Sequence, residues 1–380
     1  MNILVTGAQG FVGKNLCATL RNIAEGKDKS FGLDPDLTIF EYDVDTPPSL
    51  LHDWCAQCDF VFHLAGVNRP KDEREFAQGN RDFTQMLLDT LAKAGNACPV
   101  MLSSSIQAQM DNPYGQSKRE AEQALLAHEK RCGAKALIYR FPNVFGKWCR
   151  PNYNSVVATF CHNIANNLPI TVNDPEIRLT LVYIDDVVSA LIAALRGEEC
   201  REDGFCVVPI THSVSLGALA EYLRAFRDSR QTLAAPKVGD DFERKLYATY
   251  LSYLPAAEFS YPLRTHSDAR GSFTEILRTA ERGQFSVNIS KPGITKGQHW
   301  HNTKNEKFVV VSGQGVIRFR RIDSEEILEY VVSGEKIEVV DIPTGYTHSI
   351  VNTGQSDMVT FMWASECFNE QKPDTFYLEV

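Results

Sequence analysis

The hydrophobic pattern of this 380-residue chain changes near residue 245. Before that point, short apolar runs such as NILVTG at residues 2–7 alternate with segments of helical periodicity. This alternation predicts a parallel sheet wrapped by helices. After it, short strands follow one another at turn-marked intervals without helices between them, which is typical of an antiparallel sandwich or barrel. We therefore expect two domains, residues 1–243 and 244–380.

The composition excludes several classes of protein. Hydrophobic residues make up 43% of the chain and charged residues 23%, as in ordinary globular proteins. No apolar run approaches the roughly 20 residues needed to cross a bilayer, and the amino-terminal segment lacks the pattern of a signal peptide. A net charge of −9 argues against a nucleic-acid partner. We expect a cytoplasmic protein without membrane or nucleic-acid partners.

The ten cysteines are scattered through apparent helix and strand interiors, where we interpret them as reduced thiols serving as small apolar residues. Cys55 and Cys58 form a CxxC pair. No second pair and no thioredoxin-like context accompany it, so we interpret this pair too as buried thiols.

Three glycines follow the first expected strand at three-residue spacing. Gly7 permits a tight turn, Gly10 lets the backbone approach a pyrophosphate, and Gly13 allows a helix to pack closely. Phe11 and Val12 lie at the amino end of that helix, which favours anions. The segment is therefore expected to bind a dinucleotide.

Five further pieces occur in an order that resembles the extended short-chain dehydrogenases/reductases. They are HLAG at 63–66, SSS at 103–105, YGQSK at 114–118, YRFPNVFG at 139–146 and YIDD at 183–186. The resemblance implies that Leu64, Ala65 and Gly66 also line the cofactor site. It implies a catalytic set of Ser105, with Ser104 as the second candidate, Tyr114 and Lys118.

The spacing of Tyr114 and Lys118 has a physical meaning. The two side chains lie one helical turn apart, so the ammonium can lower the pKa of the phenol and also reach the nicotinamide ribose. Tyr114 can then protonate the alkoxide that forms when hydride reaches a carbonyl carbon.

The segment YRFPNVFGKWCRPNYNS at 139–155 belongs, in extended reductases, to the floor of a nucleotide-sugar site. Arg140 and Asn143 match the motif. Lys147 and Arg150 are nearby cations that can meet a diphosphate, with a solvated surface charge as the alternative for each.

The second half carries a predicted metal site. His299 and His301 lie two apart on one expected strand and point to the same side, Glu306 follows, and His348 comes from a later strand. Three imidazoles and a carboxylate suit a divalent ion such as zinc. The spacings resemble both motifs of the cupins, an all-β jelly-roll family.

A second resemblance competes with the first at His299. DARGSFTE at 268–275 and KPGITKGQH at 291–299 resemble the 3,5-epimerases of deoxysugar synthesis, in which a histidine at this position is a free base without metal. We favour the metal because the other three ligands are all present. Lys296, Lys304 and Tyr346 stay open as proton carriers.

The fold expected overall is a Rossmann-type, doubly wound α/β domain followed by an all-β cupin. A reductase joined to a cupin resembles, over nearly the whole length, the bifunctional UDP-sugar epimerase/reductases of capsule and O-antigen synthesis. That resemblance implies epimerisation at C3 of a UDP-4-keto-6-deoxy-N-acetylhexosamine in the cupin. Reduction of the C4 ketone then gives UDP-2-acetamido-2,6-dideoxy-L-talose, on the route to UDP-N-acetyl-L-fucosamine.

The resemblance also implies NADPH as the cofactor and a homodimer. Asp43, at the end of the second expected strand, instead favours the free ribose of NADH, so both cofactors stay open. Two other functions are weighed. A dehydratase or epimerase with a structural cupin would need an Asp-Glu pair where this chain has Ile106 and Gln107. A nucleotide-sensing protein would bind without turnover.

Overall fold

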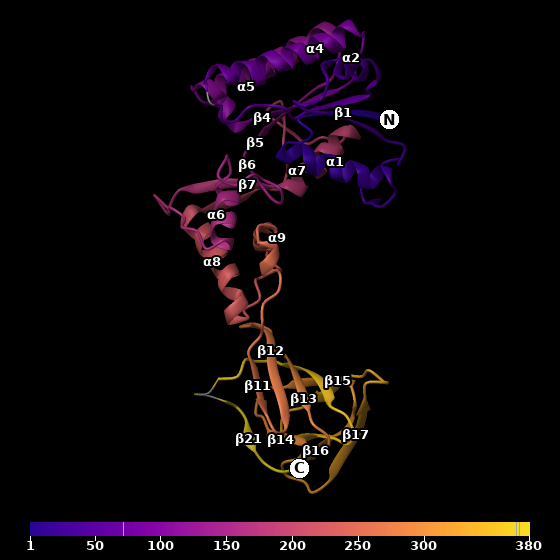
Figure 1. Cartoon of the computed structure of the whole chain (residues 1–380), viewed down its shortest axis with the longest axis vertical. Helices are drawn as coiled ribbons and strands as arrows, with labels where there is room; N and C mark the ends of the chain where they lie inside the picture. The colour runs from indigo at the N-terminus through magenta and orange to yellow at the C-terminus, as the bar shows by residue number, and fades with distance from the viewer. Residues whose placement is uncertain (71, 370, 372) are drawn as a thin grey trace. The chain divides into compact units, whose positions relative to one another are not determined.

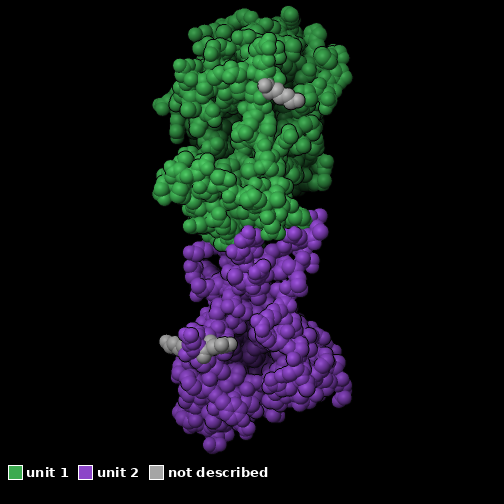
Figure 2. Space-filling view, turned by 60° about the vertical axis from the view of Figure 1, so that its left-hand side comes forward, with its two compact units in different colours: residues 1–225, 238–255 green, residues 226–237, 256–380 purple. Residues whose placement is uncertain are grey.

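The computed structural model describes residues 1–70, 72–369, 371 and 373–380, which form two compact units (Figure 2). Unit 1 contains Met1–Ala225 and Val238–Pro255, and unit 2 contains Phe226–Lys237 and Ala256–Val380. The boundary expected at 243/244 falls inside helix α9 (Asp241–Leu251), which belongs to unit 1. Each unit is therefore made of two chain segments.

Unit 1 is built on a seven-stranded sheet whose first six strands pair in parallel. Its central strands are mainly apolar because both faces are covered, and Ile3, Leu4 and Val5 are fully buried. The strand order is β2 (Thr38–Tyr42), β1 (Asn2–Thr6), β3 (Phe60–His63), β4 (Val100–Ser105), β5 (Ala136–Phe141), β9 (Phe205–Cys206) and the antiparallel β8 (Arg201–Glu202).

Helices cover both faces of this sheet (Figure 1). Ile3 and Val5 share one core cluster with apolar residues of α1 and α7, whereas Leu4 points into a second cluster with residues of α2, α4 and α5. The layers therefore follow from the alternation of side chains along each strand. The helices are α1 (Phe11–Ala24), α2 (Pro48–Gln57), α3 (Arg74–Phe76), the π-helix η1 (Ala77–Asp82), α4 (Phe83–Lys93), the 3₁₀-helix η2 (Ile106–Gln109), α5 (Pro113–Cys132) and α7 (Ile184–Leu195).

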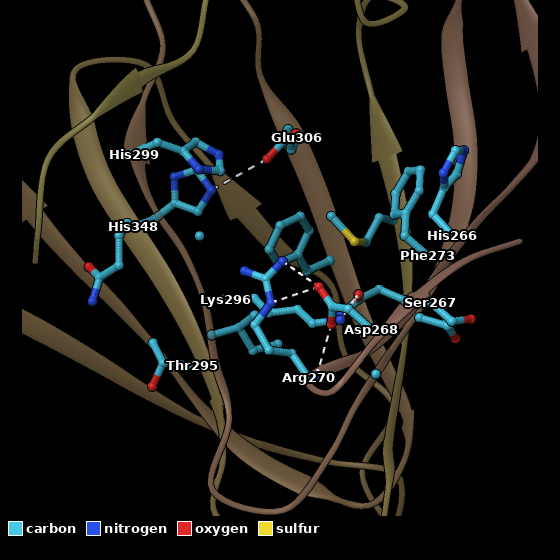
Figure 3. Close-up of a pocket in the computed structure, with 18 of the residues that line it drawn as sticks. His266, Ser267, Asp268, Arg270, Phe273, Thr295, Lys296, His299, Glu306 and His348 are labelled. Atoms are coloured by element: carbon cyan, nitrogen blue, oxygen red, sulfur yellow. Dashed lines mark hydrogen bonds and ion pairs between the residues drawn. The ribbon is translucent and has the colours of Figure 1, made fainter.

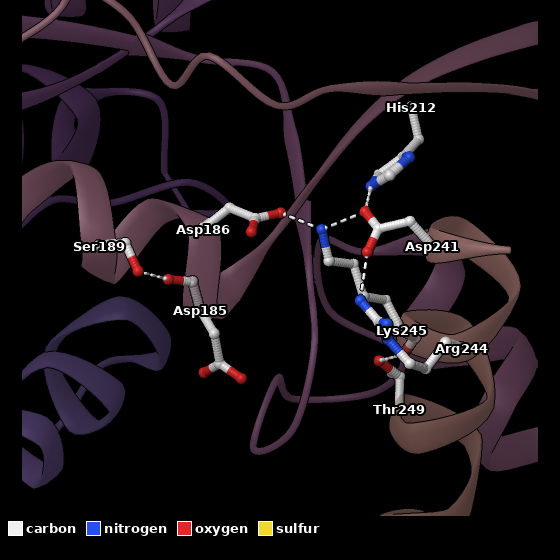
Figure 4. A network of polar contacts seen from close by, with 8 residues as sticks. All are labelled: Asp185, Asp186, Ser189, His212, Asp241, Arg244, Lys245 and Thr249. Carbon is white, nitrogen blue, oxygen red and sulfur yellow. Dashed lines mark hydrogen bonds and ion pairs between the residues drawn. The ribbon is translucent and has the colours of Figure 1, made fainter. Parts of the chain in front are cut away.

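A smaller three-stranded sheet completes unit 1. It contains β10 (His212–Ser215), β7 (Arg178–Tyr183) and β6 (Asn143–Phe145), accompanied by α6 (Val156–Ala165), α8 (Leu216–Thr232) and α9. Lys245 of α9 bridges Asp186 of α7 at 2.7 Å and Asp241 at 2.6 Å (Figure 4). The Asp241 carboxylate also lies 3.7 Å from His212 of β10. This polar cluster joins α9 to the preceding elements of its unit.

Unit 2 consists mainly of two antiparallel sheets. Phe308, Ile317, Phe319 and Ile350 belong to the apolar cluster that both sheets share, and the outward residues between them are more polar. One sheet has the order β11 (Thr265–Asp268), β12 (Gly271–Thr279), β13 (Gly283–Ser290), β20 (Met358–Ala364), β15 (Glu306–Ser312) and β18 (Val340–Ile342). The other has the order β17 (Ile327–Ser333), β16 (Gln314–Arg321), β19 (Tyr346–Asn352), β14 (Thr295–Trp300) and β21 (Phe376–Tyr377).

Residues 226–237, which form the end of α8 and the short segment after it, belong to unit 2. The hydrophobic pattern of the sequence does not indicate this. Arg278 of β12 donates its backbone N–H to the carbonyl of Leu233 at 2.8 Å and accepts from the N–H of Ala235 at 2.9 Å. The segment 233–235 thus borders β12 as a short extra strand-like piece. The 3₁₀-helix η3 (Ala256–Glu258) begins the main segment of the unit.

The expected fold class is confirmed. A parallel, Rossmann-type sheet is followed by an all-β domain of two antiparallel sheets. Among the described residues, no helix has the length and apolar character needed to cross a membrane.

Candidate active sites

The three glycines of the first turn pack against one another and against the loop after β3. Gly7 has a φ of 70°, and a Cβ added there would lie 2.6 Å from the backbone nitrogen of Ala65. A Cβ on Gly13 would lie 2.1 Å from the carbonyl oxygen of Gly7. Helix α1 begins at Phe11, directly after its N-cap Gly10, so its first N–H groups are available to an anion.

Asp43 lies beside this loop, immediately after β2. Its Oδ2 accepts the backbone N–H of Gln9 at 2.7 Å, and its Oδ1 accepts the N–H of Val44 at 2.8 Å. The carboxylate thus helps to hold the glycine loop. It also occupies the place from which an acidic side chain can bind a ribose hydroxyl.

The loop after β3 lies between the glycine turn and Lys118. Leu64 donates its N–H to the carbonyl of Thr6 at 3.0 Å, and Ala65 packs on Gly7. A Cβ on Gly66 would lie 3.0 Å from Lys118 Nζ, so a larger residue there would displace that ammonium. Leu64, Ala65 and Gly66 are therefore positioned between the two parts of the expected cofactor site.

Tyr114 and Lys118 stand on the first turns of α5, beside the end of β4. Tyr114 donates its hydroxyl hydrogen to Asn68 Oδ1 at 3.0 Å. Burial raises the pKa of Tyr114, while a hydrogen bond with Ser105 lowers it in part. Lys118 donates to the carbonyl of Ser103 at 3.1 Å, and its Nζ lies 5.8 Å from the centroid of the Tyr114 ring. The structure thus brings Ser105, Tyr114 and Lys118 together.

Lys118 is buried, and its environment changes its acidity. Burial lowers the pKa of Lys118 to about 8, against the opposing effect of the nearby Glu122 carboxylate. An ammonium with a lowered pKa still carries its charge at neutral pH. It can therefore favour the ionised form of the Tyr114 phenol.

The structure corrects two of the expected roles. Ser104, the second candidate for the catalytic hydroxyl, donates to Glu122 Oε1 at 2.5 Å in a buried network. The same carboxylate accepts Arg140 Nε at 2.9 Å and Nη2 at 2.6 Å, and the Arg140 guanidinium stacks on Phe205 with its centre 3.7 Å from the ring centroid. The Arg140 guanidinium is therefore held by Glu122 and Phe205 in the interior, so Arg140 is not a substrate contact.

The other three expected substrate residues differ in their surroundings. Asn143 is exposed and donates weakly, at 3.4 Å, to the carbonyl of Thr180. Lys147 forms an ion pair with Asp185 at 2.6 Å. Arg150 is exposed, with its guanidinium 5.3 Å from the Tyr153 ring centroid, so its donors stay accessible to a ligand.

In unit 2 the four expected metal ligands converge. One ligand atom from each of His299, His301, Glu306 and His348 lies within 4.8 Å of all the others. Glu306 Oε2 lies 3.6 Å from His301 Nε2. It lies 3.4 Å from His348 Nε2 (Figure 3). His299 lies near the end of β14, and His301 directly follows that strand. Glu306 begins β15, and His348 is in β19, where it pairs directly with His299.

The donor set fits a metal ion by its own chemistry. His301 Nε2, His348 Nε2 and Glu306 Oε2 are buried and have no hydrogen-bond partner, although buried polar atoms normally find one. Burial favours the neutral form of Glu306, but the neighbouring His301 and His348 outweigh it and lower the pKa of Glu306 overall. Burial and the neighbouring His348 lower the pKa of His299 to about 4, which leaves this imidazole neutral and able to bind a metal.

A cavity of about 530 Å³ opens beside this cluster, with His299, Glu306 and His348 in its wall. Its other wall carries Lys296 and the ion pair of Asp268 with Arg270, which is 2.6 Å long (Figure 3). Lys296 Nζ donates to Asn288 Oδ1 at 2.7 Å and to the carbonyl of Ile289 at 2.8 Å, so one of its three N–H groups is left for a ligand.

Both halves of the chain match known protein families. Residues 3–204, more than half of the chain, match the model of the NAD dependent epimerase/dehydratase family. The chain belongs to this family. Residues 266–376 match the polysaccharide biosynthesis C-terminal domain. As a family member, the chain carries a fold that binds NAD(P), which agrees with the expected class of cofactor.

Within the family, two relatives match the whole chain. A protein of Pseudomonas aeruginosa named UDP-2-acetamido-2,6-beta-L-arabino-hexul-4-ose reductase is 45% identical over 380 residues, covering 100% of this chain and 99% of the relative. The crystal structure of the capsular polysaccharide assembling protein CapF from Staphylococcus aureus is 52% identical, with a TM-score of 0.92 and full coverage of both chains. A UDP-glucose 4-epimerase from Thermotoga maritima, 20% identical over 67% of this chain and 98% of its own, with a TM-score of 0.53, shares the fold.

Several residues beside the expected cofactor site and the expected metal site were not predicted from the sequence. Asn68 contacts the Tyr114 hydroxyl, and Glu122 joins Ser104 to Arg140. Asp374 binds the turn that follows His301. The one available signal was local, since Asn68 follows HLAG almost directly and Glu122 stands one helical turn after Lys118. Asp374 is brought to its turn from the far end of the chain.

Proposed function

We propose that this chain is a bifunctional nucleotide-sugar enzyme. Its cupin domain, which lies in unit 2, epimerises C3 of a UDP-4-keto-6-deoxy-N-acetylhexosamine. Its reductase domain, which lies in unit 1, reduces the C4 ketone to UDP-2-acetamido-2,6-dideoxy-L-talose for capsule or O-antigen synthesis. The observation that carries this function is the presence of two distinct sites in one chain. The full-length relative from Pseudomonas aeruginosa, which is named as a reductase of a UDP-linked 4-keto sugar, supports it.

In the reductase site, the protein's own groups orient the ketone and supply a proton. Ser105 and Tyr114 bind the carbonyl oxygen, and Tyr114 donates its phenolic hydrogen to that oxygen as the alkoxide forms. Lys118 keeps positive charge beside the ring and binds the nicotinamide ribose. The reduced nicotinamide cofactor supplies the hydride when it is bound. Lys147 and Arg150 are the proposed contacts of the substrate diphosphate, together with Asn143 in the same segment.

We propose NADPH as the cofactor, with NADH as the alternative that Asp43 favours. The Asp43 carboxylate already accepts one backbone N–H of the glycine loop. It also lies where an acidic side chain can hydrogen-bond the adenosine ribose. A 2′-phosphate would meet this negative charge. Comparing kcat/KM for the two cofactors decides between them.

In the cupin site, a divalent metal, proposed to be zinc, would be held by His299, His301, Glu306 and His348. When bound, it polarises a ketone oxygen and makes the neighbouring C–H acidic. Lys296 is the proposed proton carrier because, of the three side chains considered for that role, it is the one that lines the cavity. Burial lowers the pKa of Lys296, which eases proton release. Lys304 instead donates to Thr375 Oγ1 at 2.9 Å.

Reduction removes the ketone that made C3 acidic, so the second reaction traps the product of the first. This chemical order supports placing both activities in one chain. We further propose a cytoplasmic homodimer, which the resemblance to extended reductases and cupins supports.

The experiment that tests the function is cofactor oxidation with the UDP 4-keto-6-deoxysugar in deuterated water, followed by NMR of the product. We expect reduction by the nicotinamide cofactor and deuterium at C3. The Tyr114→Phe variant is expected to lose reduction and keep exchange at C3, whereas Lys296→Met should lose exchange at C3. Reduction without label would refute the cupin's role, and binding without turnover would favour a nucleotide sensor.

A further inference from the structure

Cys58 and Cys98 place their sulfur atoms next to each other in unit 1. Cys58 is the C-cap residue that follows α2, just before β3, and Cys98 comes just before β4. Their Sγ atoms are 3.8 Å apart. Cys58 is 3% exposed, and Cys98 is partly exposed. The CxxC spacing of the sequence therefore does not identify the neighbouring sulfur, which comes from a residue forty positions away.

Asn96 holds the two cysteines in place. Its Nδ2 donates to the carbonyls of Cys55 and Cys58, both at 2.8 Å, and contacts Cys58 Sγ at 3.6 Å. Its Oδ1 accepts the backbone N–H of Cys98 at 2.9 Å. One side chain thus binds both segments, so the two sulfur atoms are kept together in the folded protein.

The three thiols of this region differ in acidity. A hydrogen bond from Cys98 lowers the pKa of the Cys58 thiol and outweighs the effect of its burial. The same hydrogen bond is the main cause that raises the pKa of Cys98, and burial raises it further. Burial raises the pKa of Cys55 to about 12, which leaves that thiol protonated. Because the thiolate is the reactive form, the direction of these shifts favours Cys58 over Cys98 as the nucleophile of the pair.

We propose that Cys58 and Cys98 are an oxidation site at which a peroxide closes a disulfide between them. The Cys58 thiolate attacks one peroxide oxygen, the O–O bond breaks, and Cys58 becomes a sulfenic acid while the other oxygen leaves as water. Cys98 sulfur then displaces the sulfenic oxygen, which leaves as a second water. The two thiols lose two electrons and the peroxide gains them. Rotation of the side chains closes the sulfur–sulfur gap to the roughly 2.05 Å of a disulfide.

The location predicts what this bond does. β3 and β4 are neighbouring parallel strands, with Val61 opposite Val100, and the cysteines lie at their amino ends. Ser105 and Tyr114 lie at the opposite, carboxyl end of β4. A disulfide there would tie two core strands together without touching the cofactor site. We therefore expect higher resistance to unfolding with cofactor binding unchanged.

The test treats the full-length protein with hydrogen peroxide and maps thiols and cross-linked peptides by mass spectrometry. We expect a peptide pair joined through Cys58 and Cys98, reversed by dithiothreitol, and a higher Tm for the oxidised protein. In the Cys98→Ser variant the cross-link should be absent and a sulfenic acid on Cys58 should be trapped by dimedone. The matched variant Cys200→Ser, at an exposed cysteine, should still form the cross-link.

The unmodified chain alone can overturn the proposal, so the test does not depend on how a variant folds. A Cys55–Cys58 disulfide, or oxidation confined to Cys200 with the Cys58 and Cys98 peptides unlinked, would contradict it. A Cys98→Ala variant that still yields a cross-link to Cys58 would contradict the proposed partner.

Discussion

His301 donates its Nδ1 hydrogen to the backbone carbonyl of Asp374, at a distance of 2.6 Å. A carbonyl oxygen can only accept, so this contact fixes the imidazole tautomer and leaves the Nε2 lone pair facing Glu306. The Asp374 carboxylate in turn accepts the backbone N–H groups of Asn302, Thr303 and Lys304 at 3.0, 2.9 and 2.9 Å. Asp374 thus orients a ligand of the proposed metal from outside the ligand set.

Replacing Asp374 by Ala should weaken metal binding by about 10- to 100-fold, because the turn after His301 loses the four hydrogen bonds that the carboxylate accepts, and the backbone carbonyl that orients the imidazole is then free to shift. Competition with a chromogenic chelator measures the affinity. Asp357→Ala is the matched control, since Asp357 is an exposed carboxylate paired with Lys291 at 2.7 Å. Equal metal affinity in the two variants would show that Asp374 does not position the ligand.

The reductase activity should fall as the pH rises through about 8. Lys118 has its pKa lowered to about 8 by burial, and the reaction needs its ammonium form. Above that pH the positive charge beside Tyr114 disappears, so kcat/KM declines, whereas below it the charge is complete. A pH profile of kcat/KM measures this. A profile that stays flat to about pH 9.5 would contradict the role of the Lys118 charge.

The same shift has the opposite sign for stability. The folded state holds the Lys118 proton less tightly than the unfolded state, whose pKa is near 10.5. The burial penalty therefore acts at low pH and is relieved as the pH rises between about 8 and 10.5. Lys118→Met should remove this pH-dependent increment from the unfolding free energy, as followed by urea denaturation.

Glu122→Ala should lower the free energy of unfolding by about 3 kcal/mol, because it leaves the guanidinium of Arg140 without its partner in the interior. The side chains of Arg140 and Glu122 are only 19% and 5% exposed. Glu120→Ala is the control on the same helix, since its pair with Arg81 is 3.4 Å long and more exposed, and we expect a change below about 1 kcal/mol. Urea denaturation that gave equal losses would contradict a structural role for the buried pair.

Gly66→Ala should reduce reductase turnover by about 100-fold while the protein still folds. A Cβ there would come within 2.8 Å of Asn80 Oδ1 and 3.0 Å of Lys118 Nζ, so the ammonium must move, and small displacements of a catalytic group are costly. Gly239→Ala provides the control, because a Cβ at that position meets nothing within 4 Å. Steady-state kinetics and circular dichroism together measure the effect. Undiminished kcat in Gly66→Ala would refute it.

Much of the fold and of both sites could be predicted from short sequence spacings. Gly7, Gly10 and Gly13 act within one turn, and Tyr114 and Lys118 act within one helical turn. His299 lies near the end of β14, and His301 directly follows that strand. In each case local backbone geometry alone relates the side chains, so the order of the amino acids was enough to bring their functional atoms together.

Other relationships were decided when distant segments packed. Arg140 matches a substrate-site motif, yet it pairs with Glu122 because β5 and α5 enclose both side chains and an unpaired charge there is costly. Cys58 meets Cys98 instead of Cys55 because β3 lies beside β4. His301 meets Asp374, and the segment after α8 borders β12, through contacts between residues far apart in the chain. Local periodicity carries no information on such pairs, because burial and hydrogen-bond satisfaction select them only after the sheets have assembled.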